Sequence, residues 1–330
     1  MFENMVTARL YEERLVQEYL EGKQPAFDIS AGPIPGELHL AAGHEASGAG
    51  VCIHLRPDDT VTGPHRPHHI AIAKGVDLKR MTAEIFGRST GLCRGKGGHM
   101  HLFDPEVNFA CSGIIAQGCP PAVGAALAAK KRGSDAVAVA FLGEGAIDQG
   151  GFLESLNFAA VHRLPVLFVI EDNDWAISMP KEQVTDVKDG SQRARGFALP
   201  GVRVDSDDAC DVYEAAGEAV RRARDGNGPT LLEIQVHRRM GHFMGDPETY
   251  RPDRDTELAQ QRDSIERLAA TLRRHGVSAE DVQAMRDRSS ERVEEAIAWA
   301  KEQPEPSPEE AYEHVFTDPV EPYTAGGVQS

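Results

Sequence analysis

Two short runs in the sequence combine oxygen-bearing side chains with glycine in a way that suits a metal ion beside a phosphate. The first is Gly-Glu-Gly at residues 143–145, and the second is Glu-Asp-Asn at residues 171–173. Carboxylate and amide oxygens near an anion suit Mg²⁺, which takes about six oxygen ligands and obtains several of them from phosphates and water. The glycines beside Glu144 let a ligand approach the backbone, and amides that lead into a helix favour an anion. The two runs predict a metal–diphosphate site.

The elements that position these runs can be inferred from the hydrophobic pattern. Residues 136–142 and 165–170 are continuous apolar segments, as expected for strands buried on both faces. Residues 150–162 between them show helical periodicity. This order predicts two parallel strands joined by a right-handed crossover. Because ligands bind beyond the carboxyl ends of parallel strands, we expect the two runs to converge on one spot.

The rest of the chain predicts an α/β fold, a mostly parallel sheet flanked by helices, with a helical segment at the carboxyl end. A long glycine-rich stretch at 91–119 is typical of a binding loop. Further helices are expected at residues 2–21, 44–55, 77–87, 121–132 and 208–225, and further strands at 60–62 and 230–236. We divide the sequence into an N-terminal helix and loop, the α/β domain, the helical segment and a flexible tail, at residues 1–35, 36–256, 257–318 and 319–330.

Composition excludes several classes of partner. The 35 basic and 52 acidic residues give a net charge of −17, which disfavours binding to nucleic acid or to an anionic membrane surface. No stretch approaches the roughly 20 apolar residues of a membrane-spanning helix. The amino terminus shows a charged helical pattern in place of an apolar secretory core. Five cysteines without a C-x-x-C motif are expected to be reduced. These features predict a cytoplasmic protein.

A dinucleotide-binding Rossmann fold is the alternative to a metal–diphosphate site, because Gly143 and Gly145 follow a strand. That fingerprint requires a third glycine at position 148, where this chain has Asp148. Its acidic ribose ligand is expected about 20 residues further on, whereas Glu171 lies 26 residues beyond Gly145. The spacing therefore leaves an NAD-binding dehydrogenase as the weaker interpretation.

The two runs are similar to the thiamine diphosphate signature, in which Gly-Asp-Gly is followed by an Asn-Asn pair. Other blocks resemble the α subunits of 2-oxo acid dehydrogenases and appear in the family's order over residues 35–251. They are Glu-Leu-His-Leu at 37–40, Gly-His-Glu-Ala at 43–46, Arg-Gly-Lys-Gly-Gly-His-Met-His at 94–101, Gly-Ile-Ile at 113–115, Gln-Gly at 149–150 and Gly-His-Phe-Met-Gly-Asp-Pro at 241–247. The chain thus resembles the α subunit of the thiamine-diphosphate-dependent decarboxylating component of pyruvate-, acetoin- or branched-chain-type complexes.

The resemblance implies roles for individual residues. Glu144 and Asn173 would be side-chain ligands of Mg²⁺, and the backbone carbonyl of Trp175 would be a third ligand. His39 matches a histidine that faces the reacting end of the cofactor, and with His242 it is the implied catalytic pair. The residues implied to contact thiamine diphosphate are Arg66 and His242 at the diphosphate, Gly113 and Ile115 at the aminopyrimidine ring, and Gly143, Glu144, Gly145, Ala146 and Asn173 around the metal and diphosphate.

The sequence departs from the family pattern at several positions. Glu144 replaces the usual aspartate and is one methylene longer, and Asp172 replaces the first asparagine, which adds a carboxylate near the expected site. His65 stands where the family commonly has tyrosine. Phe243 stands where mitochondrial relatives carry a regulated serine, so phosphorylation at that position is excluded. A hydrogen-bonded loop is a further interpretation of the histidine run at 65–69, whose spacing does not support a zinc site.

The family's activity implies cleavage of a carbon–carbon bond beside a carbonyl, in a pyruvate-like 2-oxo acid or in acetoin, and transfer of the fragment to a lipoyl group on an acyltransferase. Residues 72–75 and 133–139 resemble acetoin-cleaving members, while pyruvate-type members are about as close. The glutamate that activates the cofactor lies on a separate β subunit in this family, which implies an α₂β₂ heterotetramer. An alternative, motivated by Glu144, is a non-catalytic or specialised-pathway binding subunit with the same fold.

Overall fold

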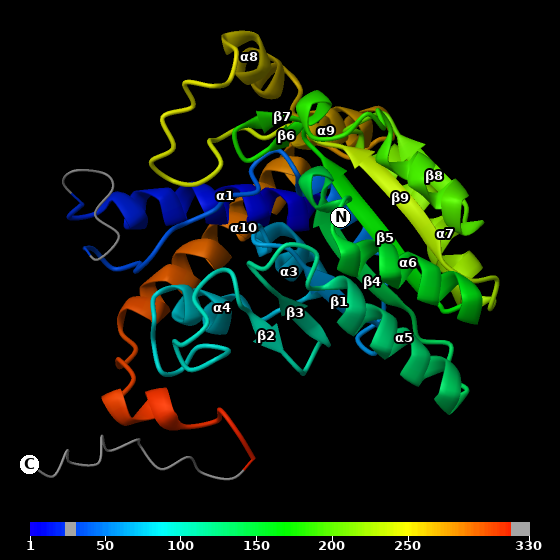
Figure 1. Cartoon of the computed structure of the whole chain (residues 1–330). Coiled ribbons are helices and arrows are strands. Elements are labelled where there is room, and N and C mark those ends of the chain that lie inside the picture. Colours follow the sequence, from blue (N-terminus) through cyan, green and yellow to red (C-terminus); the bar gives the residue numbers. More distant parts are fainter. Residues whose placement is uncertain (24–30, 318–330) are drawn as a thin grey trace, which may run out of the picture.

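A seven-stranded sheet forms the centre of the protein in the computed structural model, which describes residues 1–23 and 31–317 (Figure 1). The strand order is β2-β3-β1-β4-β5-β9-β8, and every neighbouring pair is parallel except β2 and β3. The strands are β1 Thr60–Gly63, β2 Phe103–Asp104, β3 Phe109–Cys111, β4 Ala138–Gly143, β5 Val166–Asp172, β8 Gly201–Val204 and β9 Thr230–Gln235. This arrangement confirms the predicted α/β class with a mostly parallel sheet.

Helices cover both faces of this sheet. Their bounds are α1 Phe2–Leu20, α2 Glu45–Cys52, α3 His68–Lys74, α4 Leu78–Ile85, α5 Cys119–Arg132, α6 Gly150–His162, α7 Ala209–Arg224, α8 Asp253–Gln261, α9 Ser264–Arg274 and α10 Ala279–Lys301. The helices α5 and α6 pack on one face, and α7 packs on the other, where α3 contacts β1 (Figure 1). The N-terminal helix α1 lies against α10, so two helices far apart in the sequence pack side by side.

The central strand β4 is apolar throughout because alternate residues bury against different helices. Ala138, Ala140 and Leu142 of β4 belong to the cluster with α5 and α6, whereas Val139 and Phe141 belong to the cluster on the opposite face. Successive side chains of a strand point to opposite faces, so a strand covered on both sides is mostly apolar. This double burial fixes β4 and β5 in place, and with them the loops that follow.

The structure agrees with most predicted elements and adds others. The helix at 150–162 has the predicted bounds, and the strand expected at 165–170 is β5. The histidine run is not a loop throughout, because His68 and His69 open α3, which ends at Gly75 with a φ of +96°. The short strands β2, β3 and β8 were not expected. The predicted tail at 319–330 and part of the predicted loop at 22–36 lie outside the described residues, and the four-part division of the chain stays a prediction.

Within residues 1–23 and 31–317, no helix combines the length and apolar character needed to cross a bilayer.

Candidate active site

A cavity of about 420 Å³ opens at the carboxyl edge of the sheet. Its walls come from the residues after β1, the ends of β4 and β5, the glycine-rich loop before α5, and the small hairpin of β6 (Trp175–Ala176) and β7 (Met179–Pro180). All residues that the sequence analysis predicted for catalysis, cofactor binding or metal binding line this one cavity. They are His39, Arg66, Gly113, Ile115, Gly143, Glu144, Gly145, Ala146, Asn173, Trp175 and His242. The structure thus brings together residues drawn from the whole length of the predicted domain.

Glu144 and Asn173 form the side of the cavity where a metal is expected. The strands β4 and β5 are parallel, with Gly143 opposite Glu171. Glu144 and Asn173 therefore leave the sheet within one residue of the same level. The Glu144 Oε2 atom accepts hydrogen bonds from the backbone N and from Nδ2 of Asn173, at 3.2 and 3.4 Å. The Oε1 atom of Glu144 and the Oδ1 atom of Asn173 are buried and have no hydrogen-bond partner among the described residues. Buried oxygens of this kind need a partner, and a divalent cation would supply it.

The surroundings of Glu144 disfavour its charged form. Burial, followed by the negative charge of Asp172, raises the pKa of Glu144 to about 8. A bound cation acts in the opposite direction because it stabilises the carboxylate. The residues present therefore fit the predicted metal.

Glycine is required where the backbone passes close to the hairpin. A Cβ at Gly145 would lie 2.8 Å from the Cβ of Ala176, which is too short for any side chain. Gly143, by contrast, has open space beside it. The chain then makes one 3₁₀ turn at residues 144–146 and enters α6 at Gly150. The backbone of this turn lines the cavity, which fits a ligand that binds main-chain amides.

Arg66 introduces a buried positive charge into the cavity wall. Its Nη1 donates to the carbonyl of Leu40 at 2.7 Å, and its Nη2 donates to Nδ1 of His242 at 2.9 Å. Burial and then the charge of Arg238 lower the pKa of Arg66 to about 9. Arg238 is fully buried and bonds to the carbonyl of Ile177 and the hydroxyl of Tyr250. Among the described residues neither guanidinium forms an ion pair within 4.0 Å, and Glu12, Glu144 and Glu171 act on Arg66 only from further away. An anion would offset the charge of Arg66.

Three histidines form the wall next to Arg66. The ring centroid of His39 lies 4.9 Å from that of His65 and 5.1 Å from that of His242. The centroids of His65 and His242 are 5.2 Å apart. Burial, followed by the charge of Arg66, lowers the pKa of both His39 and His242 to about 3. The same causes lower the pKa of His65 well below its ordinary value. The wall is therefore made of neutral imidazoles.

The glycine-rich loop is shaped by Glu84 of α4, which the sequence did not single out. This buried carboxylate accepts backbone N–H groups from Cys93 and Gly95 on one oxygen and from Gly97 on the other, at 2.6 to 2.9 Å. The loop then reaches the cavity at Gly113 and Ile115. Lys96 points elsewhere, because its Nζ bonds to Glu310 near the carboxyl end of the described chain.

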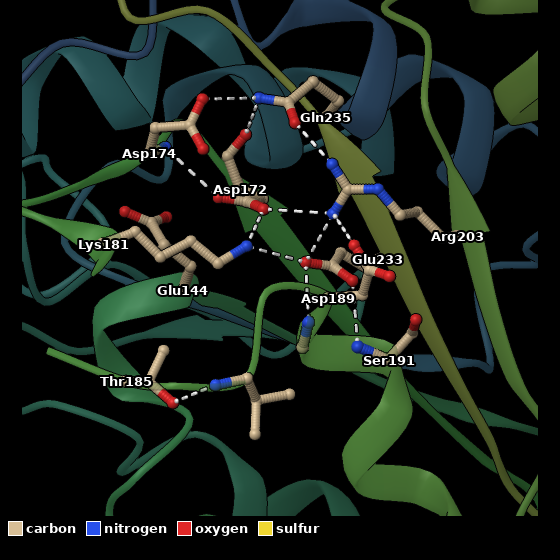
Figure 2. A network of polar contacts seen from close by, with 12 residues as sticks. Glu144, Asp172, Asp174, Lys181, Thr185, Asp189, Ser191, Arg203, Glu233 and Gln235 are labelled. Carbon is tan, nitrogen blue, oxygen red and sulfur yellow. Dashed lines mark hydrogen bonds and ion pairs between the residues drawn. The ribbon is translucent and has the colours of Figure 1, made fainter. Parts of the chain in front are cut away.

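Glu171 and Asp172, the two acids of the run at 171–173, do not line the cavity, although the sequence placed both beside the expected site. Glu171 accepts a hydrogen bond from His69 at 2.6 Å and another from Ser47. Although burial opposes the charge, His69 lowers the pKa of Glu171 below its usual range. Asp172 points into an ion-pair network with Lys181 and Arg203, as Figure 2 shows. Of the run 171–173, Asn173 alone lines the cavity.

Sequence reasoning missed Arg238 and His99, which both act on cavity residues. The basic run at 237–239 directly follows β9 at the same edge of the sheet, and that position was a usable signal. His99 lies in a block that was noticed, but nothing local indicated that its ring would bond to His39, 60 residues away.

The fold and the cavity define an α/β protein with a cavity at the carboxyl edge of a parallel sheet, lined by buried oxygens on one side and by a buried guanidinium on the other. Comparison with known proteins agrees with this class. The family model described as dehydrogenase E1 component matches residues 22–309. The chain therefore belongs to the dehydrogenase E1 component family, which implies thiamine diphosphate as the cofactor.

Several relatives match over nearly the whole chain. The α subunit of acetoin:2,6-dichlorophenolindophenol oxidoreductase from Cupriavidus necator is 43% identical over 96% of this chain and 93% of its own length. The protein of the same name from Bacillus subtilis is 39% identical, covering 99% and 95%. The chloroplastic pyruvate dehydrogenase E1 component subunit α-3 of Arabidopsis thaliana is 37% identical, covering 97% and 74%. These names favour the thiamine diphosphate interpretation over the dinucleotide alternative, and as α subunits they imply a β partner.

Proposed function

We propose that this chain is the cofactor-holding α subunit of a thiamine-diphosphate-dependent dehydrogenase that cleaves acetoin or a pyruvate-like 2-oxo acid. The observation that carries the proposal is the pairing of unsatisfied groups in one cavity. Among the described residues, a buried oxygen of Glu144 and one of Asn173 have no hydrogen-bond partner, and the Arg66 guanidinium forms no ion pair with a carboxylate. A divalent cation bound to a diphosphate satisfies both at once.

In this proposal the metal is Mg²⁺, held by Glu144, Asn173 and the backbone carbonyl of Trp175. The hard oxygen donors suit this ion. The diphosphate lies against Arg66 and His242 and against the backbone of residues 143–146. Gly113 and Ile115, on the glycine-rich loop, contact the aminopyrimidine ring. The geometry that supports these assignments is that every one of these residues lines the same cavity.

When bound, thiamine diphosphate would supply the nucleophilic carbon that the cleavage beside the substrate carbonyl requires. The chain's own residues bind and orient. Arg66 and the cation neutralise the diphosphate, and the apolar part of the glycine-rich loop, with Ile114 and Ile115, limits access of water. A bound diphosphate would offset the charge of Arg66, which after burial is the main cause of the low pKa of His39, and the ring could then take a proton from the substrate at a ring nitrogen and return it.

The remaining parts of the reaction require partners. We propose that the β subunit supplies the glutamate that activates the aminopyrimidine, in an α₂β₂ heterotetramer, and that a lipoyl group on an acyltransferase accepts the fragment. Support for a β subunit comes from the relatives, which are all named as subunits α. Of the two substrates, acetoin is favoured by the relatives at 43% and 39% identity, which carry acetoin in their names.

The test is calorimetric titration of the chain, co-expressed with its β subunit, with thiamine diphosphate and Mg²⁺. The same complex is then assayed with acetoin and a panel of 2-oxo acids and an artificial electron acceptor. We expect saturable binding and turnover of one substrate class. Binding without turnover of any substrate would support the non-catalytic alternative, and the absence of metal-dependent binding would contradict the proposal.

A further inference from the structure

The hydrogen bonds of His99 determine which nitrogen of His39 carries a hydrogen. The backbone N–H of His39 donates to Nε2 of His99 at 3.0 Å, so this nitrogen is an acceptor and carries no hydrogen. The Nδ1 atom of His39 lies 3.1 Å from the same nitrogen. Two acceptors cannot form a hydrogen bond, so Nδ1 of His39 must be the donor. In a neutral imidazole the other nitrogen is then an acceptor, which leaves Nε2 of His39 with a free lone pair.

Arg66 determines the opposite arrangement in His242. A guanidinium has N–H donors and no acceptor, and Nη2 of Arg66 lies 2.9 Å from Nδ1 of His242. That nitrogen must therefore accept, and in a neutral ring the hydrogen sits on Nε2. The neutral state is supported by the burial and the nearby charge of Arg66, which lower the pKa of His242 to about 3.

We propose that His99 and Arg66 hold His39 and His242 in opposite tautomers, so that His39 offers a lone pair and His242 offers an N–H to the occupant of the cavity. The two histidines line the same cavity with rings 5.1 Å apart. The hydrogen bonds from His99 and Arg66 determine which of the two rings donates and which accepts. His99 and Arg66 are positioning residues for this division, since each acts through the ring it bonds.

The same hydrogen bonds argue against a metal ion among the three neighbouring histidines. One ring nitrogen from each of His39, His65 and His242 lies within 4.8 Å of the others. A metal requires a lone pair from every ligand. The nitrogen that His242 leaves free carries a hydrogen, and the nitrogen with the lone pair is occupied by Arg66. Arg66 also adds a positive charge next to any cation bound there.

The consequence for catalysis rests on the proposed function, whereas the tautomers do not. His242, as an N–H donor, suits the diphosphate or another anionic group and is not a proton acceptor. His39 accepts a proton from a substrate hydroxyl at Nε2, and the O–H electron pair stays on the oxygen. The resulting imidazolium keeps its Nδ1–H on His99 and returns the proton later. General acid–base catalysis of this kind contributes about 100-fold or more to a rate.

The first experiment is ring-¹⁵N magic-angle-spinning nuclear magnetic resonance of the histidine-labelled chain in complex with its β subunit, without cofactor. Signals are assigned by their loss in His39→Gln and His242→Asn. We expect one neutral ring of each tautomer. The same tautomer in both rings, or a charged ring in either at neutral pH, would overturn the proposal. Because no cofactor is present, this result is independent of whether thiamine diphosphate is the ligand.

The second experiment uses paired amide substitutions, with His275→Gln as an exposed control and thermal unfolding as a check on folding. Glutamine at position 242 keeps an N–H donor at the place of Nε2, whereas asparagine does not reach it. We expect thiamine diphosphate affinity to fall about tenfold in His242→Asn, as for one lost hydrogen bond to a charged group, and clearly less in His242→Gln. Equal losses in the two variants would contradict the donor role.

The role of His99 is tested by His99→Leu and His99→Gln. Glutamine can still accept from both His39 donors, whereas leucine cannot. We expect kcat to fall about tenfold in His99→Leu at unchanged cofactor affinity, and glutamine to restore most of it, while His39→Gln loses about 100-fold or more. Loss of cofactor affinity in place of kcat in His99→Leu, or no difference between leucine and glutamine, would contradict a positioning role. If the unaltered complex binds no cofactor, the proposed function fails, but the tautomer assignment from the spectra still stands or falls on its own.

Discussion

Asp172 and Asn173 are adjacent in the chain, yet their side chains belong to two regions with opposite polar character. Asn173 lines the cavity, where its Oδ1 and the Oε1 of Glu144 are buried without a partner among the described residues. Asp172 lies in a network in which it and Glu233 pair with Lys181 and Arg203 (Figure 2). A buried polar atom is costly unless it is paired. The unpaired oxygens of the cavity are therefore expected to bind a ligand, whereas the paired acids of the network stabilise the fold.

Two acids and two cations form the centre of the network around Asp172, and the exposed Asp189 and Asp205 also pair with Arg203. Lys181 bonds to Asp172 and lies 3.2 Å from Glu233, and Arg203 lies 3.3 Å from Asp172 and 3.0 Å from Glu233. Glu233 also accepts the backbone N–H groups of residues 190 and 191, at 2.9 Å. Burial opposes the charge of Lys181, but the hydrogen bond to Asp172 raises its pKa above the ordinary value. In the cavity the pKa of Glu144 is raised and that of Arg66 is lowered, so both charged states lack support until a ligand binds.

Removal of a network cation should give the largest effect. We expect Lys181→Met to lower the free energy of unfolding by about 3–5 kcal/mol, because it leaves the buried acids Asp172 and Glu233 with Arg203 as their shared cation. Urea denaturation measures the change. Lys79→Met is the matched control, since Lys79 forms an exposed pair with Glu295, and it should change stability by less than about 1 kcal/mol. Similar losses in both variants would show that the buried ion pairs of the network stabilise the fold no more than an exposed pair does.

Neutralisation of the cavity acid should act on binding and not on folding. We expect Glu144→Gln to weaken binding of thiamine diphosphate with Mg²⁺ by about 100-fold, or about 2.8 kcal/mol, because the cation loses a charged ligand. Stability should be unchanged or higher, since a disfavoured buried carboxyl is removed. Calorimetric titration and thermal unfolding measure the two quantities. Asp148→Asn, which alters a partly exposed acid paired with Arg193, is the control. A stability loss without a binding loss would contradict the assignment.

The substitution Asp172→Asn separates the two regions most sharply. It removes a charged partner from Lys181 and Arg203 but leaves Glu233 in place, so we expect a loss of about 2 kcal/mol in unfolding free energy. Affinity for the metal and cofactor should stay within about threefold, because Asp172 does not line the cavity. A loss of affinity larger than tenfold at unchanged stability would place Asp172 in the ligand site.

Shortening the cavity acid should have the smallest effect. Glu144→Asp keeps the charge but withdraws the carboxylate from the two Asn173 nitrogens that it now contacts at 3.2 and 3.4 Å. We expect metal-dependent affinity to fall by less than about tenfold, or about 1.4 kcal/mol. The measurement is the same titration. An increase in affinity would show that the longer side chain is a defect of the metal site and not an adaptation to it.

Much of the site could be predicted because its main determinants are local in sequence. The apolar segments that become β4 and β5 are joined by the helix α6, and parallel strands place their carboxyl ends at one edge. That is why Glu144 and Asn173 were correctly expected to meet. The strand β8, only four residues long with two exposed positions, has no comparable pattern and was missed.

The sequence by itself determined the strand–helix–strand unit, the glycine that admits the close approach at 145, and the types of oxygen available at the edge of the sheet. The tertiary structure alone decided which of the neighbouring acids face the cavity. Glu171 turns to His69 from α3, Asp172 turns to Lys181, and only Asn173 is left for a ligand. It also brought Arg66 to His242 across 176 residues. Local periodicity fixes the face of the sheet that a side chain takes, but its hydrogen-bond partner depends on which distant segments pack there.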